Sequence, residues 1–178
     1  MKTIKFATGN PGKVEEVGGA LKDSGFEFVQ LDVDIHEIDA EDVEEVAKQK
    51  AIDSRRKALE NGDLEKDEWV IVEDTGFYVE GLNGFPSSHA GYFSRTVGAE
   101  RLLELMENIE DRSAYFKTTF ALYNGEEMIT VNGELHGEVP RKHRGESHPH
   151  LPYNSLFVPE NSDKTIAEDT GLKKDNHR

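Results

Sequence analysis

The 178-residue chain contains no cysteine and is poor in basic residues. Without cysteine it can form no disulfide and has no thiol to act as a nucleophile or a metal ligand. Lys and Arg together number 21 against 36 Asp and Glu, which gives a formal net charge of −15 at pH 7. A surface this acidic repels nucleic-acid backbones and anionic membranes, so a bound anion has to be held by a local pocket or by a metal ion.

Long apolar runs are also lacking. No stretch approaches the roughly 18 residues that a membrane-spanning helix needs, and the N-terminus does not have the pattern of a signal peptide. Hydrophobic residues make up 35% of the chain, and a chain of this length can bury the core of one domain. We therefore predict a single domain over residues 1–178, in a cytoplasmic protein that binds neither membrane nor nucleic acid.

The segment 3–21 predicts a strand, a tight turn and a helix. A short apolar run at 4–7 has strand character, and apolar residues recur at spacings of three and four from Val14 to Leu21. The polar and glycine-rich turn between them lies at a helix N-terminus, which favours anions and above all phosphate. A plain strand-to-helix connection fits the spacing as well, and the Walker pattern is absent. The candidate phosphate-binding residues are Thr8, Gly9, Asn10, Pro11, Gly12 and Lys13.

Patterning along the rest of the chain predicts an α/β protein with a mixed β-sheet. A stripe of small residues, from Val43 to Ala58, predicts a long helix with one buried face. The Asn124-Gly125 pair is a strong hairpin signal, and a hairpin adds antiparallel strands to the sheet. Further strands are expected over 26–33, 69–72, 113–123 and 128–139, and a further helix over 98–106.

Two adjacent carboxylates, Glu73 and Asp74, follow the continuous apolar run 69–72. Such a run is typical of a strand buried on both faces, so we expect the carboxylates at its carboxyl end, just before a turn. If that strand is parallel to the first, the carboxylates and the phosphate turn face the same edge, with a cation such as Mg²⁺ between them. Two acids on a solvated rim are the plainer interpretation. Glu37 lies in an acidic connection, where its neighbours prevent it from being singled out.

Two other segments contain residues with possible chemistry. His143, His148 and His150, with His136 nearby, form a loose cluster that would suit zinc, although solvated loop histidines explain it as well. The chain ends on a basic cluster from 173 to 178, which is either an ordinary frayed terminus or a segment that reaches back to a nucleotide.

The order and spacing of these segments resemble the inosine triphosphate pyrophosphatase family, in its archaeal-like form, over essentially the whole chain. The resemblance is carried by T-G-N-P-G-K at 8–13, Glu37, V-E-D-T-G-F at 72–77, L-N-G-F-P at 82–86, S-A-Y-F at 113–116, T-I-A-E at 165–168 and the terminal His-Arg. It implies an elongated α/β fold, with a mixed β-sheet flanked by helices and two lobes around a central cleft. It also implies a homodimer, Mg²⁺, and hydrolysis of the non-standard purine nucleotides ITP, dITP and XTP to the monophosphate and pyrophosphate.

The resemblance also assigns roles to residues. It places the triphosphate on residues 8–13, the metal on Glu37 and Asp74, and the general base on Asp74, and Thr75 is a further substrate-binding residue. The base pocket falls on Tyr153, Asn154, a lysine that is Lys173 or Lys174, His177 and Arg178.

The base-binding segment departs from the family pattern. Where the family has Phe-Gly-Tyr-Asp, this chain has Leu151-Pro152-Tyr153-Asn154, and the helix that follows His-Arg in the family is absent from the sequence. The leucine removes an aromatic stacking partner worth roughly 1–3 kcal/mol per base, and Asn154 lacks the charge of aspartate. We predict an active pyrophosphatase with a relaxed or shifted base preference. The alternatives are a degenerate nucleotide-binding protein without catalysis and a histidine metal-binding protein.

Overall fold

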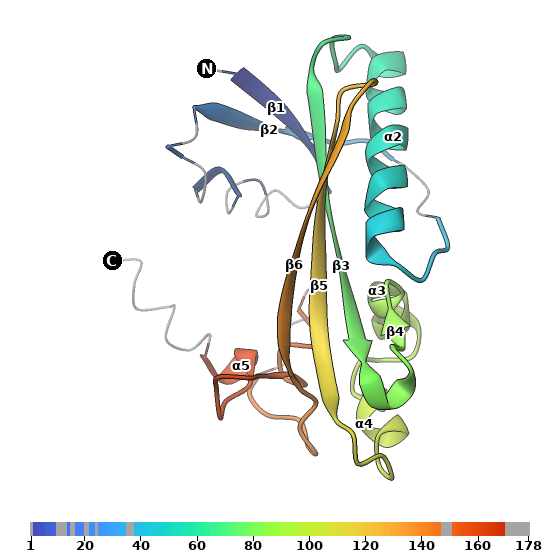
Figure 1. The fold of residues 1–178 in the computed structure, drawn as a ribbon, viewed down its shortest axis with the longest axis vertical. Coiled ribbons are helices and arrows are strands. Elements are labelled where there is room, and N and C mark those ends of the chain that lie inside the picture. Colours follow the sequence, from blue (N-terminus) through green and yellow to red (C-terminus); the bar gives the residue numbers. More distant parts are fainter. Residues whose placement is uncertain are drawn as a thin grey trace. The chain divides into compact units, whose positions relative to one another are not determined.

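The computed structural model describes residues 2–9, 14, 17–19, 22–23, 25–34, 38–146 and 151–169. Seven strands form one sheet of order β2-β1-β3-β5-β6-β7, with β4 beside β3 (Figure 1). The strands are β1 (Lys2–Ala7), β2 (Phe26–Leu31), β3 (Trp69–Val79), β4 (Pro86–Ser87), β5 (Ser113–Tyr123), β6 (Met128–Glu138) and β7 (Val158–Pro159). The helices are α2 (Val43–Asn61), the 3-10 helix η1 (Glu80–Leu82), α3 (Ala90–Thr96), α4 (Arg101–Leu105) and α5 (Ile166–Asp169).

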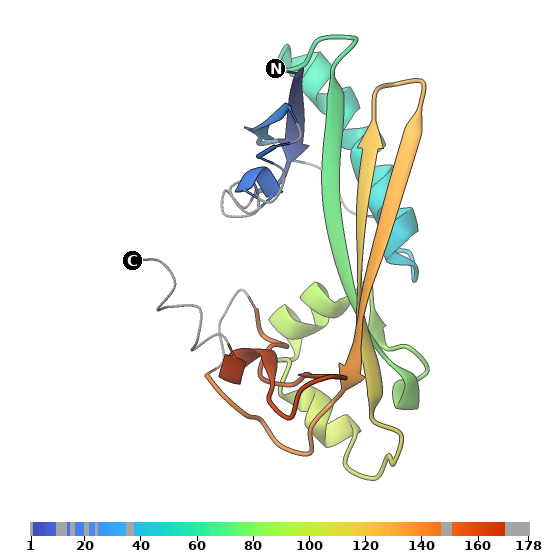
Figure 2. The same ribbon diagram turned by 60° about the vertical axis from the view of Figure 1, so that its left-hand side comes forward.

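The sheet is mixed, as predicted. β1 pairs in parallel with both β2 and β3, whereas β4 is antiparallel to β3 and β7 is antiparallel to β6. β5 and β6 lie side by side in Figure 1 and Figure 2, joined by the turn that contains the predicted Asn124-Gly125 pair. The α/β class is therefore confirmed. Within the described ranges, no helix combines the length and the apolar character needed to cross a bilayer.

The chain divides into two compact units. Unit 1 consists of Met1–Thr75 and Thr118–Gly133, and unit 2 consists of Gly76–Lys117 and Glu134–Arg178. Each unit has its own hydrophobic core, and each contains part of the residues that the sequence nominates for function.

In unit 1 both faces of the sheet are covered. On one face, small residues of α2 such as Ala47 and Ala51 pack against Val70 and Val72 of β3, and Figure 2 shows α2 lying along the sheet. The predicted small-residue stripe is confirmed, because all of its members are buried: Val43, Val46, Ala47, Ala51, Ser54 and Ala58. The helix begins at its N-cap Asp42, whose carboxylate accepts a hydrogen bond from the Glu44 amide (2.9 Å), and ends at left-handed Gly62.

The opposite face of the unit 1 sheet is covered by the segment after β1. Val14 and Val17 are helical and pack against a core of Ile4, Phe6 and Ile71. The predicted strand followed by a helix is confirmed at these positions. Leu21 and the turn residues at 10–13 lie outside the described residues.

The core of unit 2 is aromatic. Phe77 lies at its centre, with ring centroids 4.6 Å from Phe116 and 4.9 Å from Tyr153, and the Phe157 ring lies 4.9 Å from that of Phe116. The Tyr153 hydroxyl donates a hydrogen bond to the backbone carbonyl of Ala90 at 2.7 Å. Burial raises the pKa of that hydroxyl far above its ordinary value, so it remains a donor at any physiological pH.

Several boundaries differ from the sequence predictions. β2 ends at Leu31 rather than at 33, and α4 begins at Arg101 rather than at 98. The short elements η1, α3, β4, β7 and α5 were not predicted at all. A helix or strand of a few residues shows too little apolar periodicity to be recognised, and its position is decided by tertiary contacts.

The Tyr153 hydroxyl gives a direct test of the unit 2 core. In Tyr153→Phe the buried Ala90 carbonyl loses its donor, and we expect the free energy of unfolding to fall by about 1–3 kcal/mol. Chemical denaturation followed by circular dichroism measures the loss. The matched control is Tyr92→Phe on α3, whose side chain is 64% exposed. Equal stability of the two variants would contradict the role of this hydrogen bond.

Candidate active site

The candidate site in unit 1 begins where β1 ends beside β3. The parallel register pairs Phe6 with Ile71, and β1 stops one residue later at Ala7. Thr8 follows directly, and its carbonyl accepts a hydrogen bond from the Gln30 side chain at 2.9 Å. The parallel pairing on which the predicted arrangement depended is therefore confirmed.

The expectation that Glu73 and Asp74 end their strand is wrong. β3 continues through both residues to Val79. β3 extends beyond the end of its partner β1, because it pairs further along with β4 and its residue Phe77 is buried in the aromatic core of unit 2. Since side chains alternate between the faces of a strand, two adjacent carboxylates inside β3 point to opposite faces.

Asp74 lies on the α2 face of the sheet. Its Oδ1 is 3.4 Å from the Nζ of Lys50 on α2, and each side chain is 17% exposed. A carboxylate and an ammonium group of low exposure thus meet at the edge of the sheet where β1 has ended. The pair offers an oxygen ligand or proton acceptor together with a positive charge for a phosphate oxygen.

Sequence patterning did not single out Lys50. A signal was nevertheless present, because Lys50 lies between Ala47 and Ala51, which belong to the buried stripe of the helix. A lysine that borders a buried helix face places its charged end next to the sheet on which the helix packs.

Glu73 and Thr75 lie on the other face of β3. The Thr75 hydroxyl donates to Glu73 Oε1 at 2.5 Å and lies 2.8 Å from the Thr118 hydroxyl of β5. This is the face of Ile71, against which Val14 and Val17 pack. Thr75 is thus on the side of the sheet that carries the segment following the predicted phosphate turn.

Many of the predicted site residues lie outside the part of the chain that the structure describes, and their assignments stay predictions. They are Asn10, Pro11, Gly12, Lys13, Glu37, Lys173, Lys174, His177 and Arg178, together with His148 and His150 of the histidine cluster. Among the described residues, no three or more acidic or histidine side chains are grouped so as to hold a metal ion. His136 pairs instead with Glu134 (Nε2 to Oε2, 3.0 Å) and stacks on Tyr115.

The predicted base-binding segment, residues 151–154, lies in unit 2. Leu151 is exposed, Tyr153 is buried in the core, and Asn154 is half-buried. The backbone amide of Asn154 donates to the Leu151 carbonyl (3.1 Å), and the backbone carbonyl of Asn154 accepts from the Ala167 amide (2.9 Å). The segment is therefore a turn whose backbone is fixed by the T-I-A-E segment.

Comparison with known proteins covers both units. A dITP/XTP pyrophosphatase from Pyrococcus horikoshii is 39% identical over 167 residues, which covers 94% of this chain and 84% of that protein. A crystal structure of a nucleoside-triphosphatase, or dITP/XTP pyrophosphatase, from Mycobacterium abscessus superposes with a TM-score of 0.77 at 26% identity over 97% of this chain and 91% of that one. A HAM1 protein structure from Coxiella burnetii gives a TM-score of 0.79 at 25% identity, covering 94% of this chain and 87% of that one. The model of the Ham1 family matches residues 4–178, and this chain belongs to that family.

Proposed function

We propose that this protein is a nucleoside triphosphate pyrophosphatase that hydrolyses dITP, ITP and XTP to the monophosphate and pyrophosphate. Such a reaction removes deaminated purines from the nucleotide pool. The observation that carries the proposal is the Asp74–Lys50 pair at the edge of the unit 1 sheet, in a chain that matches an enzyme named dITP/XTP pyrophosphatase over 94% of its length.

The reaction breaks the bond between the α- and β-phosphates, and water supplies the oxygen that the nucleoside monophosphate gains. Phosphoryl transfer of this kind depends on positioning and on neutralising charge. In the proposed mechanism Asp74 orients the attacking water and accepts its proton. Lys50 holds the carboxylate in place and offsets charge on the phosphates. Thr8, Gly9 and Lys13, with the helix N-terminus after β1, bind the triphosphate.

Mg²⁺ is the proposed cofactor, with Asp74 and Glu37 as its protein ligands. Asp74 fits this role, because it is a hard oxygen donor with low exposure on a strand that pairs in parallel with β1. When bound, the ion would neutralise charge that develops on the phosphate oxygens. Glu73 points to the other face with Thr75 and takes no part in this proposal. Asp74 therefore serves the ion and the water together or in turn.

We also propose that Asn154, Lys173, His177 and Arg178 recognise the base, and that Tyr153 supports this set from the core. The chain is further proposed to act as a single domain, as a homodimer and in the cytoplasm. Exposed apolar side chains on β6, Ile129 and Val131, support self-association, since they lie on a strand with few charges in an otherwise very acidic protein.

A degenerate nucleotide-binding protein is the alternative function. It is favoured by the base-binding segment, where exposed Leu151 and half-buried Asn154 replace the aromatic and acidic residues of the family pattern. Calorimetry that detects nucleotide binding without pyrophosphate release would select this alternative.

The proposal predicts pyrophosphate release from ITP, XTP and dITP in the presence of Mg²⁺. The same assay with ATP, GTP, CTP and UTP measures the base preference, and we expect weaker discrimination than a base pocket with an aromatic stacking partner gives. Addition of EDTA should abolish release, and excess Mg²⁺ should restore it. Failure to turn over any of these triphosphates would refute the proposed function.

Lys50 gives a second test. In Lys50→Gln the ammonium group beside Asp74 is replaced by a shorter, neutral polar side chain, and we expect kcat/KM for ITP to fall about 100-fold. Lys57→Gln is the matched control, because it removes a lysine from the exposed side of the same helix. Equal kcat/KM values for the two variants would show that Lys50 has no part in the reaction.

A further inference from the structure

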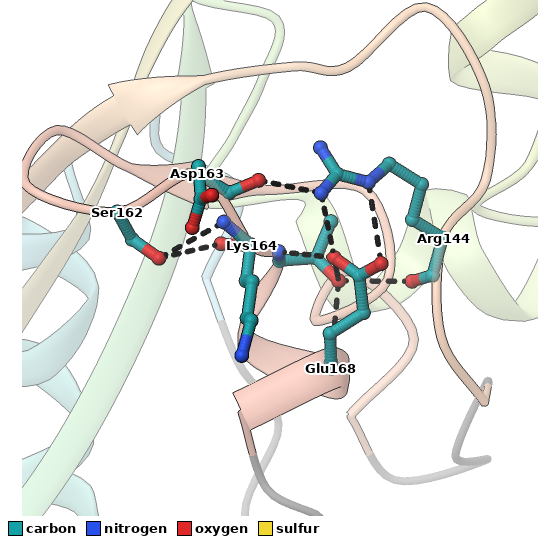
Figure 3. Close-up of polar contacts among 6 residues, drawn as sticks. Arg144, Ser162, Asp163, Lys164 and Glu168 are labelled. Carbon is teal, nitrogen blue, oxygen red and sulfur yellow. Dashed lines mark hydrogen bonds and ion pairs between the residues drawn. The ribbon is translucent and has the colours of Figure 1, made fainter.

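Arg144 lies at the centre of a polar cluster in unit 2. Its guanidinium makes two contacts with the Glu168 carboxylate. Nη2 lies 2.9 Å from Oε2, and Nε donates to Oε1 at 3.3 Å. Nη2 also donates to the backbone carbonyl of Asp163 at 2.5 Å. Figure 3 shows the guanidinium and the carboxylate facing each other beside the start of α5. We call Arg144, Thr165 and Glu168 the Arg144 clamp.

Thr165 closes the clamp from the buried side. Its side chain is fully buried, and its hydroxyl donates to the Arg144 carbonyl at 2.9 Å. Thr165 and Glu168 also form a capping box, in which the Thr165 amide donates to Glu168 Oε2 at 2.8 Å and the Glu168 amide donates to the Thr165 hydroxyl at 3.3 Å. The hydrogen bond from the Thr165 amide, followed by the contact with Arg144, lowers the pKa of Glu168. The carboxylate is therefore charged at neutral pH.

The clamp holds the backbone at Asn154 and at the next residue, Ser155. The Arg144 amide donates to the Ser155 carbonyl at 3.1 Å, and the Ala167 amide donates to the Asn154 carbonyl at 2.9 Å. Gly145, which has a positive φ, lets the segment of Arg144 approach the segment of Ala167 closely, since a Cβ atom at Gly145 would lie 2.9 Å from the Ala167 Cβ. The carbonyls of Asn154 and Ser155 are thus held by these two segments, which the clamp joins.

The clamp is better suited to positioning the backbone than to adding to the free energy of unfolding. The Arg144 and Glu168 side chains are each 30% exposed, and ion pairs with this much solvent contact contribute little to the free energy of folding. The planar guanidinium fork, however, fixes direction as well as distance, which a lysine in the same place does not.

We propose that Arg144 is a positioning residue that sets the preference for the base, because it fixes the backbone that carries Asn154. This inference rests on the proposed function in one respect, namely that Asn154 faces the base. Arg144 does not touch the substrate in this account. Its effect is confined to recognition of the base and leaves the phosphate chemistry of unit 1 unchanged.

The test compares two ligands that need no turnover. Titration calorimetry with IMP, which has a base, and with inorganic pyrophosphate, which has none, is carried out on the wild type, Arg144→Lys and Glu168→Gln. We expect the Kd for IMP to rise about tenfold in both variants while the Kd for pyrophosphate is unchanged. In the steady state the KM for ITP should rise, kcat should stay within about twofold, and the preference for ITP over GTP should shrink.

Arg101→Ala is the matched control, because it removes an arginine of unit 2 whose ion pair with Glu104 is exposed (56% and 65%). The inference is overturned if Arg144→Lys and Glu168→Gln both bind IMP as the wild type does, or lose IMP and pyrophosphate affinity equally. The latter result identifies a purely structural role. If one variant does not fold, the titrations of the other variant test the inference. Absence of pyrophosphate release by the wild type would refute the proposed function but not the inference about Arg144, because the IMP titrations still measure the effect of the clamp.

Discussion

The parallel pairing of β1 with β3 is the constraint on which the candidate site depends. The pairing brings Thr8 to the edge where β3 carries Glu73, Asp74 and Thr75, and it ends before β3 does. Because β3 stays extended, the alternation of its side chains separates neighbouring residues. Asp74 goes to the α2 face and meets Lys50, whereas Glu73 and Thr75 go to the face covered by the segment after β1. The geometry gives each carboxylate a different environment.

The elements that the sequence predicted well have either a long, regular pattern or a strong turn signal. The small-residue stripe of α2 was found because its periodicity extends over many residues, and the hairpin of β5 and β6 was found because Asn124-Gly125 is a strong local turn signal. The end of β3 was misjudged because Asp74-Thr75-Gly76 reads as a turn, and only the pairing with β4 and the burial of Phe77 show that the strand continues. Lys50 was missed for a related reason, since its partner is 24 residues away in sequence. No local pattern reports a contact of that kind.

The two units divide the proposed work. Unit 1 carries the groups suited to phosphate chemistry, which every nucleoside triphosphate requires. Unit 2 carries the segment that departs from the family pattern, and its backbone is held by an aromatic core on one side and by the Arg144 clamp on the other. In the proposed function, changes at Leu151 and Asn154 therefore alter the groups offered to a base while the turn that carries them is kept. A shifted base preference with intact hydrolysis is the outcome that this division favours.

In the proposed mechanism Asp74, and not its neighbour Glu73, serves the reaction. The most direct measurement is kcat for pyrophosphate release from ITP by Asp74→Asn and Glu73→Gln, two substitutions at adjacent residues that each remove one negative charge. We expect a loss of at least about 100-fold in Asp74→Asn, as for a general base, and retention of most activity in Glu73→Gln. Full activity in Asp74→Asn, or an equal loss in both variants, would contradict the proposed mechanism.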